Sequence, residues 1–144
     1  MTIQIRPVVK GDIDSILLLL QQLWPKKKIH LHQIQSLIQQ QLLSRNHHLV
    51  VAEQQNRVIG FGSLSRKINL WTEGMLGHID ELVVDDREQQ RGIGTIILNY
   101  IIERGLQLGC RRIELDSAYH RKQAHQFYQR KGFVNRAILF SKQV

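Results

Sequence analysis

The sequence predicts an α/β fold in which helices flank a central mixed sheet. Apolar residues recur at helical spacing in four segments, and they alternate with polar residues in the strand-like segments between them. The predicted elements follow the order β-α-α-β-β-β-α-β-α-β, with hairpin strands early and a crossover helix later. This order differs from the regular alternation of a doubly wound dinucleotide-binding fold. No repeat or linker interrupts the pattern, so we expect one domain over residues 1–144.

The first half of the chain is predicted to hold three strands and two helices. Pro7 favours the end of the first strand, Asp12 is expected to cap the first helix, and Pro25 stops that helix. The turn at residues 54–56 joins the two strands of a hairpin. The predicted ranges are strand 2–9, helix 13–24, helix 31–42, and hairpin strands 47–53 and 57–64.

The second half is predicted to hold three strands and two helices. Gly109 and Gly132 are expected to stop the two helices, because glycine readily adopts the left-handed conformation that ends a helix. The predicted ranges are strand 76–85, helix 95–108, strand 111–117, helix 124–130 and a last strand within 133–142.

Composition excludes several classes of protein. The 144 residues are 42% hydrophobic, which is ordinary for a globular protein, and no apolar run approaches the roughly 18 residues of a membrane span. The N-terminus has no signal-peptide pattern. The single cysteine, Cys110, rules out an internal disulfide and is expected to be an inert thiol. Together these features predict a cytoplasmic protein without a membrane partner.

The net charge of +8 raises the alternative of a nucleic-acid-binding module. The cations are dispersed along the chain and do not form one basic stretch, so we do not expect a nucleic-acid partner. Lys26–Lys28 fit a solvated loop. Several other cations lie in or near the segment 89–94 or its neighbours, where they could bind the phosphates of a ligand. These are Arg87, Arg91, Arg111, Arg112, Arg121, Lys122, Arg130 and Lys131.

A diphosphate site is predicted where the strand 76–85 meets the helix 95–108. Between them lies Gln89-x-x-Gly92-x-Gly94, and small residues at a helix start let backbone N–H groups approach an anion. The chain lacks the GxxxxGK[ST] of a Walker loop and the GxGxxG of a dinucleotide fold. The alternative is an ordinary strand–helix turn that binds nothing.

Three stretches together resemble the GNAT family of N-acetyltransferases. IQIRPVVKGDIDSI (residues 3–16) resembles its opening strand and helix, and HIDELVVDDREQQRGIGTIILNYII (78–102) matches its strand, acyl-coenzyme-A loop and helix. AHQFYQRKGF (124–133) resembles its short helix with a tyrosine, and VVAEQQNRVIGFGSL (50–64) fits its second and third strands. The resemblance covers nearly the whole chain. It implies the GNAT acyl-CoA N-acyltransferase fold and direct transfer of an acetyl group from acetyl-CoA to an amine.

The resemblance also implies which residues hold acetyl-CoA, the expected co-substrate. A splayed fourth strand would hold the pantetheine with its backbone, and the loop would hold the diphosphate. The family often has an asparagine where this chain has Arg121, so one coenzyme contact is in doubt, although Arg121 could meet a phosphate instead. The expected coenzyme-binding residues are Leu82, Val83, Val84, Gln89, Gln90, Arg91, Gly92, Ile93, Gly94, Thr95, Arg121, Ala124 and Phe127.

Two residues are candidates for the proton transfers. Tyr128 matches the family tyrosine that protonates the leaving thiolate, and the alternative is a tyrosine that only packs beside Phe127. Glu81 is the candidate general base, because a carboxylate inside an apolar strand is costly to bury. Asp80 competes for this role, and a purely structural ion pair is the other alternative.

The acceptor site is less determined. Trp24, Trp71, Asp80 and His120 are candidates for contacting the acceptor, although each tryptophan could equally be a packing residue. His78 and His120 could also relay protons. The other histidines lack ligand spacing with acidic partners, so we expect no metal.

The sequence therefore predicts an acetyl-CoA-dependent N-acetyltransferase acting on a primary amine, of a small molecule more than of a protein. The alternative on the same fold is a non-catalytic acyl-CoA-binding sensor. The oligomeric state is left open between a monomer and a homodimer.

Overall fold

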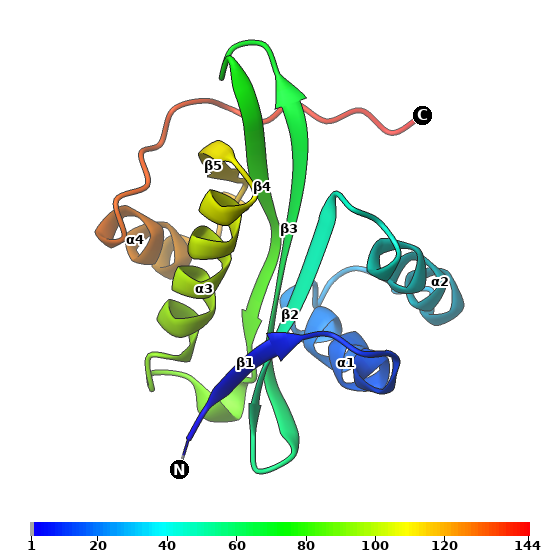
Figure 1. The fold of residues 1–144 in the computed structure, drawn as a ribbon. Helices are drawn as coiled ribbons and strands as arrows, with labels where there is room; N and C mark the ends of the chain where they lie inside the picture. The colour runs from blue at the N-terminus through cyan, green and yellow to red at the C-terminus, as the bar shows by residue number, and fades with distance from the viewer. Residues whose placement is uncertain (1) are drawn as a thin grey trace. The chain divides into compact units, whose positions relative to one another are not determined.

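The computed structural model describes residues 2–144 and contains a five-stranded sheet with the strand order β1-β2-β3-β4-β5 (Figure 1). The β1/β2, β2/β3 and β3/β4 pairs are antiparallel. The strands are β1 (Gln4–Pro7), β2 (His47–Gln54), β3 (Arg57–Asn69), β4 (Gly74–Val84) and β5 (Cys110–Leu115). The helices are η1 (Lys10–Asp12), α1 (Ile13–Leu23), α2 (Leu31–Leu42), η2 (Asp86–Glu88), α3 (Ile93–Gln107) and α4 (Lys122–Arg130).

The chain folds as two compact parts, residues 1–114 and Leu115–Val144. The first part contains nearly all of the sheet with α1, α2 and α3, and the second contains α4. That both parts act as one domain over residues 1–144 stays a prediction. Within residues 2–144, no helix combines the length and apolar character needed to cross a bilayer.

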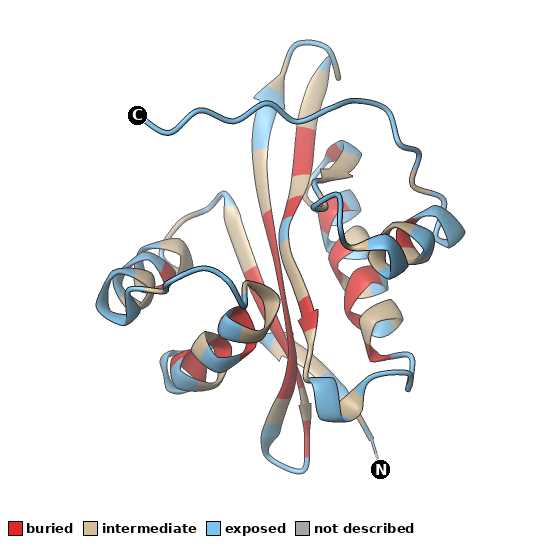
Figure 2. Cartoon of the chain, turned by 180° about the vertical axis from the view of Figure 1, so that it is seen from behind, coloured by how far each residue is buried: buried red, intermediate tan, exposed pale blue. Residues whose placement is uncertain are grey.

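Helices pack on both faces of the sheet in the first part. On one face, apolar side chains of α1 and α2 form a core with Phe61 of β3 and Val83 of β4. On the other face, Ile97 and Ile101 of α3 lie against Gly62, where a β-carbon would approach them to 2.7 and 2.6 Å. Figure 2 shows buried residues along the sheet and along α3. The close approach of α3 therefore requires glycine at position 62.

A β-bulge changes which face of β4 each side chain occupies. Ser63 pairs with Glu81, whereas the next residue, Leu64, pairs with Ile79, so Asp80 is an extra residue in β4. Consecutive residues of a strand lie on opposite faces, and therefore Glu81 and Ile79 also lie on opposite faces although they are two residues apart. Glu81 shares the face of Val83, which carries α1 and α2, and the bulge places Ile79 on the other face.

The side chain of Asp12 does not cap α1, contrary to the prediction. Asp12 stands at the N-cap position, but its carboxylate accepts two hydrogen bonds from Arg6, at 2.8 and 2.9 Å, and one from the Val9 backbone N–H. Arg6 also pairs with Glu53 of β2. The Arg6 guanidinium lowers the pKa of Asp12. A bidentate pair with a guanidinium joins two opposite charges through two parallel hydrogen bonds, which explains the preference over a single cap bond.

The predicted last strand is also wrong. Among residues 2–144, no strand follows β5, although 133–142 alternate suitably. Gly132 has a φ of 92°, and Phe133 donates its backbone N–H to the Tyr128 carbonyl at the end of α4. The backbone N–H and C=O groups of a strand must bond to a neighbouring strand, and an alternating sequence pattern does not by itself provide that neighbour. The other elements form near their predicted ranges, with β3 extending five residues beyond the predicted end at 64.

Candidate active site

Glu81 and Ser63 form a reciprocal pair across β3 and β4. The Ser63 hydroxyl donates to Glu81 Oε1 at 2.5 Å, and the Glu81 backbone N–H donates to Ser63 Oγ at 3.1 Å. Ser63 is buried at 2% exposure, so its hydroxyl has few other partners. The pair fixes one carboxylate oxygen of Glu81 and does not use Oε2.

Burial raises the pKa of Glu81. The hydrogen bond from Ser63 acts in the opposite direction because it stabilises the carboxylate, and the nearby charge of Asp80 adds to the increase. A carboxylate with a raised pKa and a free oxygen is suited to accept a proton near neutral pH. The structure therefore gives Glu81 the properties expected of the predicted base.

Asp80 occupies a different environment from Glu81. As the extra residue of the bulge it is exposed, and its Oδ1 lies 2.7 Å from Nδ1 of His78. The two carboxylates are adjacent in sequence but do not share a face of the strand. Asp80 and His78 thus form a pair of their own beside Glu81.

At the end of β4, the polar backbone groups of alternate residues point away from β3. The Asp85 N–H donates to the Ile59 carbonyl at 2.9 Å and therefore faces β3, whereas the Asp85 carbonyl accepts from the Glu88 N–H at 2.8 Å. Successive residues of a strand alternate the side to which these groups point. The N–H and C=O groups of Leu82 and Val84 therefore point to the opposite side, toward which a ligand with amide groups could pair.

β5 does not reach the end of β4. Side chains of β5 lie beside residues near the start of β4, with Arg111 beside Gly74 and with Cys110 and Ile113 beside Gly77. β5 ends at Leu115, two residues after Ile113. Leu82–Val84 consequently extend past the end of β5, as expected for a splayed fourth strand.

The loop after β4 leads into α3 with backbone groups available to an anion. Gln90 and Gly92 have φ values of 64° and 77°, and Gly92 is the N-cap of α3 with no side-chain capping bond. The Ile96 N–H is the first to bond within the helix, to the Gly92 carbonyl at 3.1 Å. The N–H groups of the residues between them lack partners within the helix. This geometry fits the diphosphate of a coenzyme A molecule.

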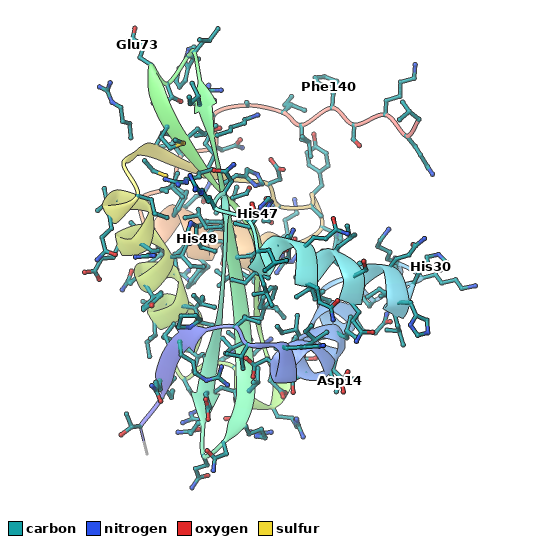
Figure 3. All side chains as sticks on the ribbon, turned by 45° about the vertical axis from the view of Figure 1, so that its right-hand side comes forward. Asp14, His30, His47, His48, Glu73 and Phe140 are labelled. Atoms are coloured by element: carbon teal, nitrogen blue, oxygen red, sulfur yellow. The ribbon has the colours of Figure 1, made fainter. Side chains whose placement is uncertain are left out.

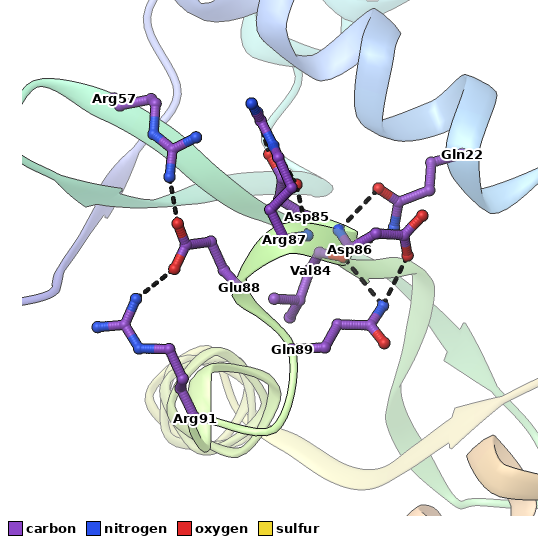
Figure 4. Close-up of polar contacts among 9 residues, drawn as sticks. All are labelled: Gln22, Arg57, Val84, Asp85, Asp86, Arg87, Glu88, Gln89 and Arg91. Atoms are coloured by element: carbon purple, nitrogen blue, oxygen red, sulfur yellow. Dashed lines mark hydrogen bonds and ion pairs between the residues drawn. The ribbon is translucent and has the colours of Figure 1, made fainter.

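Side chains of the loop bond chiefly to one another and to neighbouring strands (Figure 4). Gln89 bonds to Asp86 at 3.0 Å and lies 3.4 Å from the Val84 carbonyl. Glu88 pairs with both Arg57 of β3 and Arg91, and Arg91 also donates to Gln54 at 3.1 Å. These contacts lower the pKa of Glu88, whose largest stabilising partner is Arg91. Gln89 and Arg91, two of the predicted coenzyme-binding residues, are thus held by contacts within the protein.

The two tryptophans occupy separate positions in the first part of the chain. Trp24 packs against the core formed by α1, α2 and the sheet. Trp71 lies in the turn between β3 and β4, where the Arg112 guanidinium lies 4.5 Å from its ring. Because Gly74 and Glu81 are seven residues apart along β4, Trp71 lies about 20 Å from Glu81. The structure does not bring Trp71 and Glu81 together within this part.

The remaining predicted site residues lie in the second part of the chain. Tyr128 is buried on α4, and its ring makes edge contacts with Phe127 at 5.3 Å and Phe133 at 5.7 Å. Burial raises the pKa of Tyr128, while the charge of Arg121 lowers it. Arg121 is the N-cap residue of α4, Ala124 lies within that helix, and His120 precedes it.

The structure shows contacts that sequence patterns did not reveal. Ser63 and Gln22 are separated from their partners by 18 and more than 60 residues, so no local motif marks them. Within residues 2–144, no group of three or more His, Cys, Asp and Glu residues is placed so that it could hold a metal ion. Figure 3 shows His30 at the start of α2, apart from His47 and His48 on β2. The expectation that no metal takes part stays a prediction.

Known proteins identify the family. The model of the acetyltransferase (GNAT) family matches residues 13–133. The chain belongs to the GNAT family. The aminoalkylphosphonate N-acetyltransferase of Salmonella typhimurium is 29% identical over 139 residues, which cover 96% of this chain and 90% of the relative. The glucosamine 6-phosphate N-acetyltransferase of Arabidopsis thaliana is 30% identical over 69 residues, 48% of this chain and 44% of the relative.

Solved GNAT structures confirm the predicted fold. An aminoglycoside N-acetyltransferase in complex with CoA has a TM-score of 0.85 to this chain at 20% identity, and the match covers 99% of this chain and 96% of that one. The predicted family is confirmed, and this GNAT protein is an acetyl-CoA-dependent acetyltransferase.

Proposed function

We propose that this protein transfers the acetyl group of acetyl-CoA directly to the primary amine of a small molecule, with Glu81 as general base. The observation that carries the proposal is the half-buried carboxylate of Glu81, held by Ser63 three residues before the end of the strand that leads into the phosphate loop. Acetyl-CoA supplies an activated thioester. The amine nitrogen attacks its carbonyl carbon, so that a C–N bond forms and the C–S bond breaks.

Glu81 accepts the proton that the amine must lose. An amine attacks only with a free electron pair, and at neutral pH most primary amines are protonated. The raised pKa of Glu81 brings its basicity closer to that of the amine, and Oε2 is free to take the proton directly or through water. The neighbouring Asp80 is exposed and paired with His78, which makes it a weaker candidate for the same role.

Tyr128 donates a proton to the departing thiolate in this proposal. Its burial raises its pKa, so the phenol stays protonated throughout the neutral range. Over one turnover, Glu81 gains the proton that the amine loses, and Tyr128 loses the proton that the sulfur gains, so the protons balance. Solvent then restores both groups to their starting states.

The backbone at the end of β4 and the start of α3 holds the coenzyme. The groups of Leu82 and Val84 that point away from β3 suit the amides of pantetheine, and the N–H groups after Gly92 suit the diphosphate. Val83 directs its side chain into the core, so its contribution is the position of the backbone. Arg91 lies beside this segment as a cation for the phosphates.

The acceptor is proposed to be a small amine that carries an anionic group. By their names, the two curated relatives act on an aminoalkylphosphonate and on glucosamine 6-phosphate, and each of these molecules combines an amine with a phosphorus-containing anion. The exposed Lys26, Lys27 and Lys28 follow α1 and Trp24 and offer positive charge to such a substrate. Coulomb attraction at an exposed loop favours encounter with such a substrate.

A thiol-release assay with acetyl-CoA and a panel of amines tests this proposal. The panel contains an aminoalkylphosphonate, glucosamine 6-phosphate, a neutral amino sugar, an aminoglycoside and a lysine-containing peptide. We expect turnover with at least one small amine and the highest kcat/KM with an anionic one. Binding of acetyl-CoA in calorimetry without turnover on any amine would instead support the acyl-CoA sensor. Preference for the peptide would contradict the small-molecule assignment.

A further inference from the structure

The side chain of Gln22 joins α1 to the point where β4 becomes the phosphate loop. Its Nε2 donates to the Val84 carbonyl at 2.8 Å, and its Oε1 accepts from the Asp86 backbone N–H at 3.0 Å (Figure 4). The side-chain amide of Gln22 thus donates to one residue and accepts from another that lies two positions further along the chain. A glutamate lacks the donor and a methionine lacks both groups, so only an amide of this length satisfies the pair.

The two atoms that Gln22 holds lie where the strand of the proposed coenzyme site passes into the phosphate loop. The Val84 carbonyl points away from β3, on the side where Leu82–Val84 extend past the end of β5. Asp86 is the first residue of η2, which leads to the loop containing Gly92. Gln22 therefore sets where the last carbonyl of the strand lies and where the loop begins. Its closest competitor, Gln89, lies farther from the same carbonyl, at 3.4 Å.

The part of α1 that carries Gln22 is anchored in the core. The neighbouring Leu19 and Leu20 are buried in the core that α1 shares with Phe61 and Val83. The helix ends immediately afterwards, where the Trp24 N–H bonds to the Leu20 carbonyl at 2.9 Å. Because the Gln22 side chain is anchored in this way, the position of α1 determines the position of the junction between β4 and the phosphate loop. A shift of the helix would move the amide and its two partners.

We propose that Gln22 is a positioning residue that pre-forms the acetyl-CoA site by holding the Val84 carbonyl and the Asp86 N–H. The inference rests on the function proposed above and adds a residue from outside the coenzyme-binding segment. Without Gln22, part of the binding free energy must be spent on ordering the junction of strand and loop. The loss should appear in coenzyme affinity, not in the chemical step.

Calorimetry with acetyl-CoA on the full chain tests this role with two variants and a control. We expect Gln22→Met, which removes both hydrogen bonds, to raise the Kd for acetyl-CoA by about tenfold. Gln22→Glu should raise it further, because a carboxylate faces the Val84 carbonyl and the incoming phosphates. Gln21→Met should leave the Kd unchanged, since Gln21 is exposed and its amide lies 3.5 Å from the Lys27 carbonyl.

Kinetics and hydrogen exchange distinguish positioning from a general loss of structure. Positioning predicts a higher KM for acetyl-CoA with kcat within about twofold at saturation, and faster amide exchange at Asp86 while the core of α1 stays protected. Unchanged Kd and KM in both Gln22 variants, or a fall in kcat alone, would overturn the inference while leaving the proposed function intact. Failure of the wild-type protein to bind acetyl-CoA would overturn both.

Discussion

Ser63 and Glu81 hold each other through two hydrogen bonds that run in opposite directions between neighbouring strands. The hydroxyl donates to the carboxylate at 2.5 Å and accepts from the backbone N–H of the same glutamate at 3.1 Å. The pair follows from the regular register that sets Glu81 opposite Ser63, immediately before the bulge at Asp80 interrupts the ladder. Ser63 therefore fixes the orientation of the carboxylate and opposes the effect of burial on its pKa.

Ser63→Ala should move the acid limb of the pH profile. Without the hydroxyl, the carboxylate loses its stabilising bond and the pKa of Glu81 rises further. The acid limb of kcat/KM should shift to higher pH, and activity should recover as the pH rises above the new pKa. Ser65→Ala, on the same strand but opposite His78, is the control. An unmoved acid limb in Ser63→Ala would show that the titrating group is not Glu81.

Glu81→Gln should make the protein more stable at alkaline pH. The folded-state pKa of Glu81 lies above its unfolded value, so its contribution to stability is present at low pH and is lost as the pH rises through the folded-state pKa. The neutral amide has the same shape and avoids that loss. Thermal unfolding should give a higher Tm for the variant at pH 8 and similar values at pH 4. A lower Tm at pH 8 would mean that Glu81 is a stabilising ion-pair member instead.

Tyr128→Phe should slow turnover without weakening coenzyme binding. Removal of a general acid typically costs about 10²-fold or more in kcat, while the ring and its contacts with Phe127 and Phe133 are kept. Tyr119→Phe removes the same hydroxyl from a tyrosine that is 77% exposed and should have no effect. Steady-state kinetics and calorimetry with acetyl-CoA measure the two quantities. Wild-type kcat in Tyr128→Phe would leave the tyrosine with a packing role only.

Gly92→Ala and Gly109→Ala should separate stability from coenzyme binding. Both glycines have a positive φ, 77° and 84°, and at both a β-carbon would meet no atom within 4 Å. Each substitution should therefore cost about 1 kcal/mol of unfolding free energy through backbone strain alone. Urea unfolding should show similar losses. Only Gly92→Ala should weaken acetyl-CoA binding, because its methyl group lies at the start of the phosphate site; equal Kd values for both variants would contradict this placement.

The elements that local sequence patterns determine were predicted well. The helices, the hairpin and the loop before α3 follow from periodicity, glycine and proline, which act within a few residues. Gly109 and Gly132 adopt the left-handed conformations expected where α3 and α4 end. The family motifs added the candidate base and acid, which periodicity alone does not assign.

Features that depend on distant partners could not be predicted. Asp12 fits an N-cap by its position, but a nearby arginine binds its carboxylate more strongly. The bulge at Asp80 is invisible to an alternating pattern, although it places Ile79 and Glu81 on opposite faces. Gln22 reaches across more than 60 residues to Val84, and the segment after Gly132 has strand-like alternation but forms no strand. In each case tertiary contacts outweigh the local signal.

The pH dependence of kcat/KM in Glu81→Gln, with the best small amine as acceptor, tests the central claim most directly. If Glu81 is the general base, the variant loses about 10²-fold or more in kcat/KM and its acid limb disappears, while the Kd for acetyl-CoA stays within about twofold of the wild-type value. An active variant that keeps the wild-type acid limb would contradict the account and move the base to another group.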